Sequence, residues 1–349
     1  MPGNIGAWEI NRPHNKFGAH DLNKSKITAL IFVKILITGG LIYWLFSRVD
    51  VDNLAKILVL IKPSQIIGAI FLHIAVFLFG WFRWWLLFRH IGTSSPFLKT
   101  LPSYYLGVFF NNVLPTGMGG DAIRTFHLTL RGLSLKVLVA SAIVDRVIGL
   151  VVVLAIGATG FFLSLDSNLV GSRKIFLLIA VLAVVTASWL FLAPRFIGLV
   201  ERLAHKYQHT RIRKGLLVLI SLCYSYGSAK KLLLAAIGLT VALQGLVIFI
   251  YYYLGSCIGL ELPFVTYLVV IPVVAIAASL PISIGGLGVR EGTLVGLLVT
   301  GGADGQLAIA LSLLFLLVLW VASLPGALML LTSIKNKSRL KVDVTLHKS

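Results

Sequence analysis

The sequence is poor in acidic residues and in cysteine. Aspartate and glutamate together number 12, against 31 lysines and arginines, and there are two cysteines among 349 residues. Cys223 and Cys257 have neither metal-ligand nor redox spacing, and the eight histidines form no paired-ligand pattern. No nucleotide-binding or catalytic motif is recognisable. We therefore expect no metal, no cofactor and no enzymatic activity.

The excess of positive charge does not indicate a nucleic-acid partner. The formal net charge is +19, but the basic residues lie in tails and loops between apolar runs, not in one patch interleaved with aromatic residues. Hydrophobic residues make up 58% of the chain, and the mean hydropathy is +0.96. This composition indicates an integral membrane protein whose basic loops follow the positive-inside rule.

The apolar runs predict an all-α integral membrane protein, a multi-span helical bundle. A core about 30 Å thick requires about 20 residues per helical span. Runs that meet this length lie at 27–46, 65–89, 137–165, 174–193, 232–258 and 305–333. Residues 51–62 are too short and too charged to span, and they read as an amphipathic interfacial helix. We divide the chain into a polar tail (1–26), a transmembrane domain (27–333) and a basic tail (334–349), with a basic loop at 194–231.

One motif occurs twice, at 114–124 and 280–290, with the pattern L-P-x-x-x-G-G-x-x-x-R. Inside a helix, proline costs about 3 kcal/mol and each glycine about 1 kcal/mol relative to alanine. Each copy therefore predicts a broken helix, and irregular backbone at membrane depth is tolerated only where protein buries it or it lines a cavity. We interpret 101–131 and 263–300 as two re-entrant segments, which points to a substrate site at the interface of two repeats.

The distribution of lysine and arginine predicts the topology. With a cytoplasmic N-terminus and re-entrant segments that do not cross, 21 of the 31 lysines and arginines lie on the cytoplasmic side and 5 outside. The other 5 lie at membrane depth or near an interface. Both termini are then cytoplasmic, and the two broken segments enter from opposite sides. We expect the breaks to approach each other near the bilayer midplane, as inverted repeats of an alternating-access transporter do.

The charges at membrane depth are the candidate site residues. Arg124 and Arg290 each lie nine residues after the motif proline, on the first turns of the resuming helix. An arginine beside a helix N-terminus, with glycines that allow close approach, suits a phosphate group. The alternative is that each arginine only holds its break together, by pairing with Asp121 or Glu291. Either way a buried arginine needs a counter-charge, so we expect carboxylates to pair with both.

Asp145 and Arg146 lie within an otherwise apolar run. Adjacent residues of a helix point about 100° apart, so each should pair with another helix rather than with its neighbour. Asp145 is a candidate partner of Arg124 or Arg290, or a coupling-proton site; the alternative is a structural ion pair. We expect one polar cavity lined by Asn112, Arg124, Asp145, Arg146, Arg290 and Glu291. Arg83 lies near an interface and is interpreted as snorkelling, and Lys34, His73 and Gln244 as inter-helix hydrogen-bonding residues.

Three motifs, in order along the chain, resemble the flippase-like family, the transmembrane region of lysylphosphatidylglycerol synthases and their stand-alone relatives. They are Asn112-x-x-Pro115 with Gly119-Gly120-Asp121 and Arg124; Asp145-Arg146-x-x-Gly149-Leu150; and Pro281-x-x-x-Gly285-Gly286-Leu287-Gly288-x-Arg290-Glu291. In the synthases this region is associated with moving aminoacylated phospholipid across the bacterial inner membrane, and a separate soluble domain transfers the aminoacyl group. Only a short basic tail follows residue 333 here, so aminoacyl transfer is not implied.

The resemblance and the motifs together give one substrate-binding set. It comprises Asn112, Pro115, Gly119, Gly120, Asp121, Arg124, Asp145, Arg146, Pro281, Gly285, Gly286, Arg290 and Glu291.

Three functions stay open on the sequence. The first is a flippase-like transporter of a phospholipid or related anionic or zwitterionic lipid in the bacterial inner membrane. The second is an integral membrane enzyme that modifies a lipid. The third is an accessory subunit of a lipid pathway that uses hopanoids, polyprenyl-linked glycans or aminoacyl lipids. The expected partner is a membrane lipid, and a homo-oligomer or a complex with a lipid-synthesis enzyme is left open.

Overall fold

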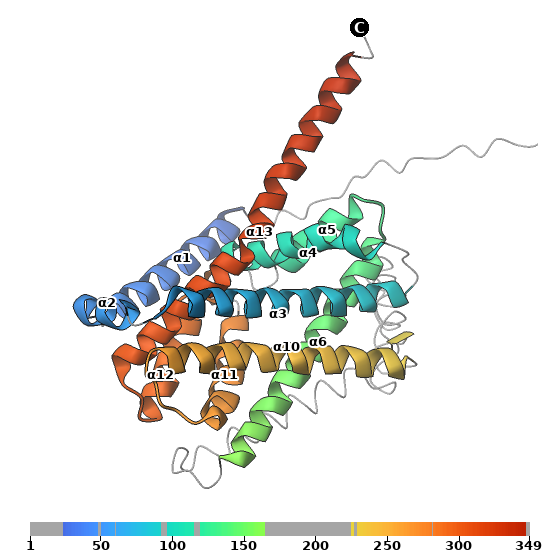
Figure 1. Ribbon diagram of the computed structural model, residues 1–349. Coiled ribbons are helices and arrows are strands. Elements are labelled where there is room, and N and C mark those ends of the chain that lie inside the picture. Colours follow the sequence, from blue (N-terminus) through green and yellow to red (C-terminus); the bar gives the residue numbers. More distant parts are fainter. Residues whose placement is uncertain are drawn as a thin grey trace, which may run out of the picture.

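The computed structural model describes residues 24–47, 50–59, 61–91, 96–114, 119–164, 225–226, 229–280 and 282–346. Over these ranges the named elements are all helices (Figure 1). In chain order they are α1 (Lys24–Phe46), α2 (Val51–Val59), α3 (Pro63–His90), α4 (Phe97–Val113), α5 (Gly119–Thr129), α6 (Leu135–Leu163), α10 (Lys230–Cys257), α11 (Phe264–Ser279), the 3₁₀ turn η1 (Ile284–Gly286), α12 (Val289–Thr300) and α13 (Gly305–Leu346). The expected span at 174–193 and almost all of the basic loop at 194–231 lie outside the described residues.

Four helices in the described part of the chain are long and apolar enough to cross a membrane. They are α3, α6, α10 and the Gly305–Met329 part of α13. Two shorter apolar helices, Phe32–Trp44 within α1 and Phe264–Ser279, accompany them. The prediction of an all-α membrane protein is therefore confirmed.

Aromatic packing holds the centre of the bundle together. α3 and α10 run side by side, and α13 crosses them (Figure 1). Tyr251 of α10 stacks on Phe315 of α13 with ring centroids 3.8 Å apart. His73 of α3 lies edge-on to Phe77 and Phe315. Lipid tails are as apolar as leucine, so helices in a membrane gain little from apolar burial itself, and the close packing of these rings supplies the attraction between them.

The first broken segment forms a hairpin of α4 and α5. Two glycines allow the close approach, because a Cβ atom on Gly120 would collide with the carbonyl oxygen of Gly107. The backbone N–H of Gly120 donates to Oδ1 of Asn111 at 2.9 Å, close to the break. At the other end of the hairpin, Nη1 of Arg131 donates to the carbonyl of Lys99 at 3.0 Å. The start of α4 and the end of α5 therefore lie together.

The second broken segment consists of α11, η1 and α12. Gly285, Gly286 and Gly288 have φ values of 58°, 76° and 80°, a left-handed region that glycine adopts at little cost. α1 supports this turn, because the N–H of Ile284 donates to Oγ1 of Thr38 at 3.0 Å. The motif glycines are thus required by the backbone conformation of the break.

The two breaks lie against each other, as the sequence predicts. A Cβ atom on Gly285 would meet the backbone carbonyl of Asn112, the penultimate residue of α4. Their position near the bilayer midplane, and their entry from opposite sides, stay predictions. α13 continues beyond residue 333 into the expected basic tail, as far as Leu346, and projects from the bundle (Figure 1).

Candidate functional site

α6 connects the two broken segments. Asp145 and Arg146, in its first half, form ion pairs with α5. In its second half Gly157 and Gly160 lie against Pro272 and Leu268 of α11; a Cβ atom on Gly160 would collide with Leu268, and one on Gly157 would be tight against Pro272. A single long helix therefore carries the intramembrane charges on the side of one hairpin and a close helix contact on the side of the other.

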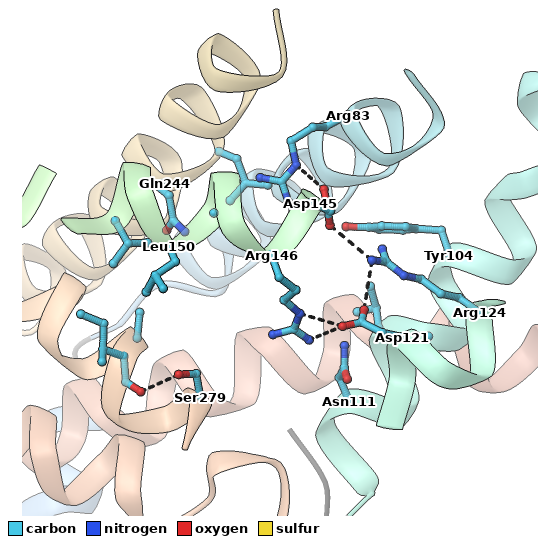
Figure 2. Close-up of a pocket in the computed structure, with 17 residues that line it drawn as sticks. Arg83, Tyr104, Asn111, Asp121, Arg124, Asp145, Arg146, Leu150, Gln244 and Ser279 are labelled. Carbon is cyan, nitrogen blue, oxygen red and sulfur yellow. Dashed lines mark hydrogen bonds and ion pairs between the residues drawn. The ribbon is translucent and has the colours of Figure 1, made fainter. Parts of the chain in front are cut away.

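A cavity of about 440 Å³ lies between these elements. Five charged residues line it: Arg83 of α3, Asp121 and Arg124 of α5, and Asp145 and Arg146 of α6 (Figure 2). Neutral polar groups come from Tyr104, Asn111, Gln244 and Ser279. Much of the remaining wall is apolar, with contributions from α6, α10 and α11: Leu150, Val153, Leu243, Ala275 and Ile276.

Asp145 accepts ion pairs from two helices. Nε of Arg83 lies 2.7 Å from Oδ1, and Nη2 of Arg124 lies 3.2 Å from Oδ2 (Figure 2). Nη1 of Arg83 also donates to Oγ1 of Thr240 on α10 at 2.8 Å. Asp145 on α6 therefore joins α3 and α5 directly, and it joins α10 through Arg83.

Asp121 holds the other side of the same network. Nη2 of Arg124 lies 3.1 Å from Oδ1 of Asp121, and Nε of Arg146 donates to Oδ2 at 2.7 Å. The guanidinium of Arg124 lies 4.2 Å from the ring centroid of Trp84, a cation–π contact that favours a desolvated cation. Nε of Arg124 is buried without a hydrogen-bond partner among the described residues.

Three arginines and two aspartates give the cavity one excess positive charge. Asp145 lies ten residues after Leu135, the start of α6, which is about 15 Å along the helix axis. α6 has 29 residues and is about 43 Å long, so Asp145 lies about a third of the way along it, inside a core about 30 Å thick that is centred on the helix. Charges at such depth are costly unless they are paired, and removal of one partner from a buried pair destabilises by about 3–5 kcal/mol.

The structure separates the two motif arginines that the sequence expectation assigned to one cavity. Arg290, Glu291 and Asn112 are not among the residues that line it. Nη2 of Arg290 lies 2.8 Å from Oε1 of Glu291, and the N–H of Gly288 donates to Oε2 of Glu291 at 2.6 Å. The second copy thus uses its acid to cap α12, whereas the acid of the first copy pairs with α6. The physical reason is the place of the acid: Asp121 precedes Arg124, but Glu291 follows Arg290.

The predicted ion pairs form, whereas the predicted role of Arg83 does not hold. The expected pairing of carboxylates with Arg124 and Arg290 is confirmed, and so is the pairing of Asp145 and Arg146 with other helices. The interpretation of Arg83 as a snorkelling residue is wrong, because its side chain is 10% exposed and bound to Asp145.

The glycines of the predicted set lie at the two breaks. Gly119 and Gly120 begin α5, and Gly285 and Gly286 form the turn η1. Pro115 and Pro281 lie outside the described residues. His73 is packed in the core, with Nδ1 buried and unpartnered among the described residues.

Besides Arg83, four polar lining residues were missed or misread from the sequence: Tyr104, Asn111, Gln244 and Ser279. Ser279 directly precedes the second motif and Asn111 lies three residues before the first, so proximity to the breaks was the available signal. Tyr104 had no such signal. Its position depends on Gly80 of α3, where a side chain would collide with the Tyr104 hydroxyl.

Comparison with known proteins agrees with the motifs and the helical architecture. Residues 31–326 match the family described as "Lysylphosphatidylglycerol synthase TM region". The chain belongs to this family. It is also similar to the UPF0104 membrane protein MJ1595 of Methanocaldococcus jannaschii, with 26% identity over 130 residues. That match covers 36% of this chain and 38% of the relative. Membership establishes a membrane protein of a family with a lipid-related function.

Proposed function

We propose that this protein moves a phospholipid, or a related anionic or zwitterionic lipid, between the two leaflets of a membrane. The observation that carries the proposal is the cavity between the broken segments, whose lining combines a cluster of charged side chains with apolar side chains. α4 and α5 supply Tyr104 and Arg124, α6 supplies Asp145 and Arg146, and α11 supplies Ile276. A lipid has the same division, with a charged head group and hydrocarbon tails.

The arrangement of the charges suits binding and release of a phosphate. Arginine binds phosphate and carboxylate oxygens with the same planar set of N–H donors. A phosphate that enters the cavity can therefore compete with Asp121 and Asp145 for the guanidinium groups of Arg124 and Arg146. Exchange of one anion for another keeps the desolvation cost similar in the loaded and unloaded states. Movement of a charged head group across the membrane needs such a balance.

We place the protein in the bacterial inner membrane with both termini in the cytoplasm. In this proposal each broken segment is re-entrant, and the two enter from opposite sides. The contact between Arg131 and the Lys99 carbonyl supports this for the first segment, since the hairpin begins and ends at one place. Inverted broken helices that meet at a site are the arrangement on which alternating access is built.

The test is a leaflet-exchange assay on the purified protein in phosphatidylcholine vesicles that contain a tail-labelled phosphatidylglycerol. The variant is Arg124→Lys, which keeps the charge but loses the fork of N–H donors. We expect exchange to fall by about tenfold, since a hydrogen bond to a charged group contributes about 1.5–3 kcal/mol. Arg89→Gln is the matched control, because Arg89 is an exposed arginine near the end of α3 that contacts Trp85.

Thermal unfolding in detergent has to show that both variants remain folded. Wild-type vesicles that exchange no lipid above protein-free vesicles would contradict transport and favour an accessory subunit. A changed lipid, detected by mass spectrometry of the same vesicles, would favour a lipid-modifying enzyme.

A further inference from the structure

We infer that the cavity selects a lipid whose head group has net negative charge and hydroxyl groups, and rejects one that carries an ammonium group. The inference rests on the proposed transport function and specifies its substrate class. It follows from how the carboxylates of the cavity are used, from the residual charge, and from the neutral polar groups that remain.

All four carboxylate oxygens of the cavity are already bound by arginine. Oδ1 and Oδ2 of Asp145 pair with Arg83 and Arg124. Oδ1 and Oδ2 of Asp121 pair with Arg124 and Arg146 (Figure 2). An ammonium group that entered would have to share these carboxylates with guanidinium groups that repel it. Like charges close together in a buried site are unfavourable, and the lining supplies no further carboxylate to offset the added positive charge.

Glu291, the remaining carboxylate at the broken segments, offers no substitute. Its Oε1 pairs with Arg290 and its Oε2 accepts the N–H of Gly288, and it does not line the cavity. Within the described part of the chain, the lining therefore provides no carboxylate oxygen outside these arginine pairs.

The residual charge points in the same direction. Three arginines against two aspartates leave one positive charge, which attracts a phosphate and repels an ammonium group. Arg146 is the most accessible of the three arginines, with 41% of its side chain exposed, against 10% for Arg83 and 6% for Arg124. A phosphate can thus reach Arg146 without first disrupting the deeper pair of Arg83 and Asp145.

The neutral lining groups suit hydroxyls. Asn111 and Gln244 each carry an amide that donates and accepts, and Tyr104 and Ser279 each carry a hydroxyl. Oγ of Ser279 donates to the carbonyl of Ile276 at 2.7 Å, so its oxygen can accept a bond from a ligand. Side chains that both donate and accept can pair with a head-group hydroxyl, which also does both. A glycerol or sugar head group on a phosphate fits this lining.

The experiment compares three tail-labelled lipids in the same phosphatidylcholine vesicles. Phosphatidylglycerol carries net negative charge and hydroxyls, phosphatidylethanolamine is zwitterionic with an ammonium group, and lysine-esterified phosphatidylglycerol is cationic. We expect phosphatidylglycerol to exchange fastest, by about tenfold over the cationic lipid, which corresponds to about 1.4 kcal/mol. The same order should appear in the lipids that copurify from a mixed membrane, measured by mass spectrometry.

Equal exchange of the three lipids, or faster exchange of the cationic one, would overturn the selectivity while transport itself stood. Exchange of none of them would overturn both proposals.

Arg146→Gln provides a second experiment, because it lowers the net charge of the cavity from one positive charge to zero. It should reduce the preference for phosphatidylglycerol, Arg146→Lys should restore most of it, and Arg89→Gln should leave it unchanged. An unaltered preference in a folded Arg146→Gln protein would show that charge does not select the lipid.

Discussion

Arg83 and Asp145 form a buried ion pair between α3 and α6, with Nε of Arg83 2.7 Å from Oδ1 of Asp145. Both side chains are 10% exposed or less, and Arg83 also binds Thr240 of α10. The pair joins three helices that are long and apolar enough to cross a membrane. It therefore connects the stability of the bundle with the shape of the cavity.

Replacement of Arg83 by methionine should destabilise the protein strongly. The change keeps the apolar stem but leaves Oδ1 of Asp145 without its cation, and a broken buried pair costs about 3–5 kcal/mol. Thermal unfolding in detergent, followed by circular dichroism, measures the effect. Arg89→Gln, on the exposed end of the same helix, should stay within about 0.5 kcal/mol of wild type. Equal unfolding temperatures for wild type and Arg83→Met would show that the pair contributes nothing to stability.

Replacement of Gly120 by alanine should open the hairpin of α4 and α5. The added Cβ would collide with the backbone carbonyl of Gly107, and overpacking of this kind costs about 1–3 kcal/mol. Gly238→Ala is the matched control, because a Cβ on Gly238 of α10 meets nothing within 4 Å. Alanine there should be neutral or stabilising by up to about 1 kcal/mol. A pair of unfolding curves that coincide would mean that the contact of α4 with α5 is not tight.

Cysteine labelling should place both ends of each hairpin on one side of the membrane. In a protein with Cys223 and Cys257 replaced by serine, single cysteines at Lys99 and Ser134 should react with an impermeant thiol reagent from the cytoplasmic side. Single cysteines at Glu261 and Thr300, the two ends of the second segment, should both react with the same reagent from the outside. All four chosen positions are exposed. Labelling of Lys99→Cys and Ser134→Cys from opposite sides would mean that the first segment crosses the membrane, which removes the argument for inverted repeats.

Substitution of Arg290 tests whether the second break takes part in transport. Arg290 pairs with Glu291 beside the start of α12, so a lipid phosphate could compete there as at the first break. We expect Arg290→Lys to lower exchange by about tenfold, because an ammonium group cannot reproduce two-point contacts to phosphate, and Arg290→Ala to lower it further. The measurement is lipid exchange in vesicles, with unfolding temperature as the control for folding. Wild-type rates in both folded variants would assign Arg290 a structural role alone.

The sequence by itself determined the class of the protein and the places where its helices break. Long apolar runs have few structural solutions in a membrane, since every backbone polar group must be satisfied within a helix. Pro and Gly at the same spacing in both motif copies therefore located the breaks. The observed hairpins, from Phe97 to Thr129 and from Phe264 to Thr300, agree closely with the expected segments. Local chemistry was enough for these conclusions.

The tertiary structure alone decided which charges meet. Asp145 selects Arg83 and Arg124, and Arg146 selects Asp121, through contacts between residues 21 to 62 positions apart in the chain. Nothing in the local sequence near Arg83 distinguishes a snorkelling arginine from one turned into the bundle. The separation of Arg290 from the cavity likewise appears only in the structure, where Arg290 pairs with the adjacent Glu291 and neither residue lines the cavity. Local sequence determines whether a helix forms or breaks, whereas helix packing determines which buried charges can reach one another.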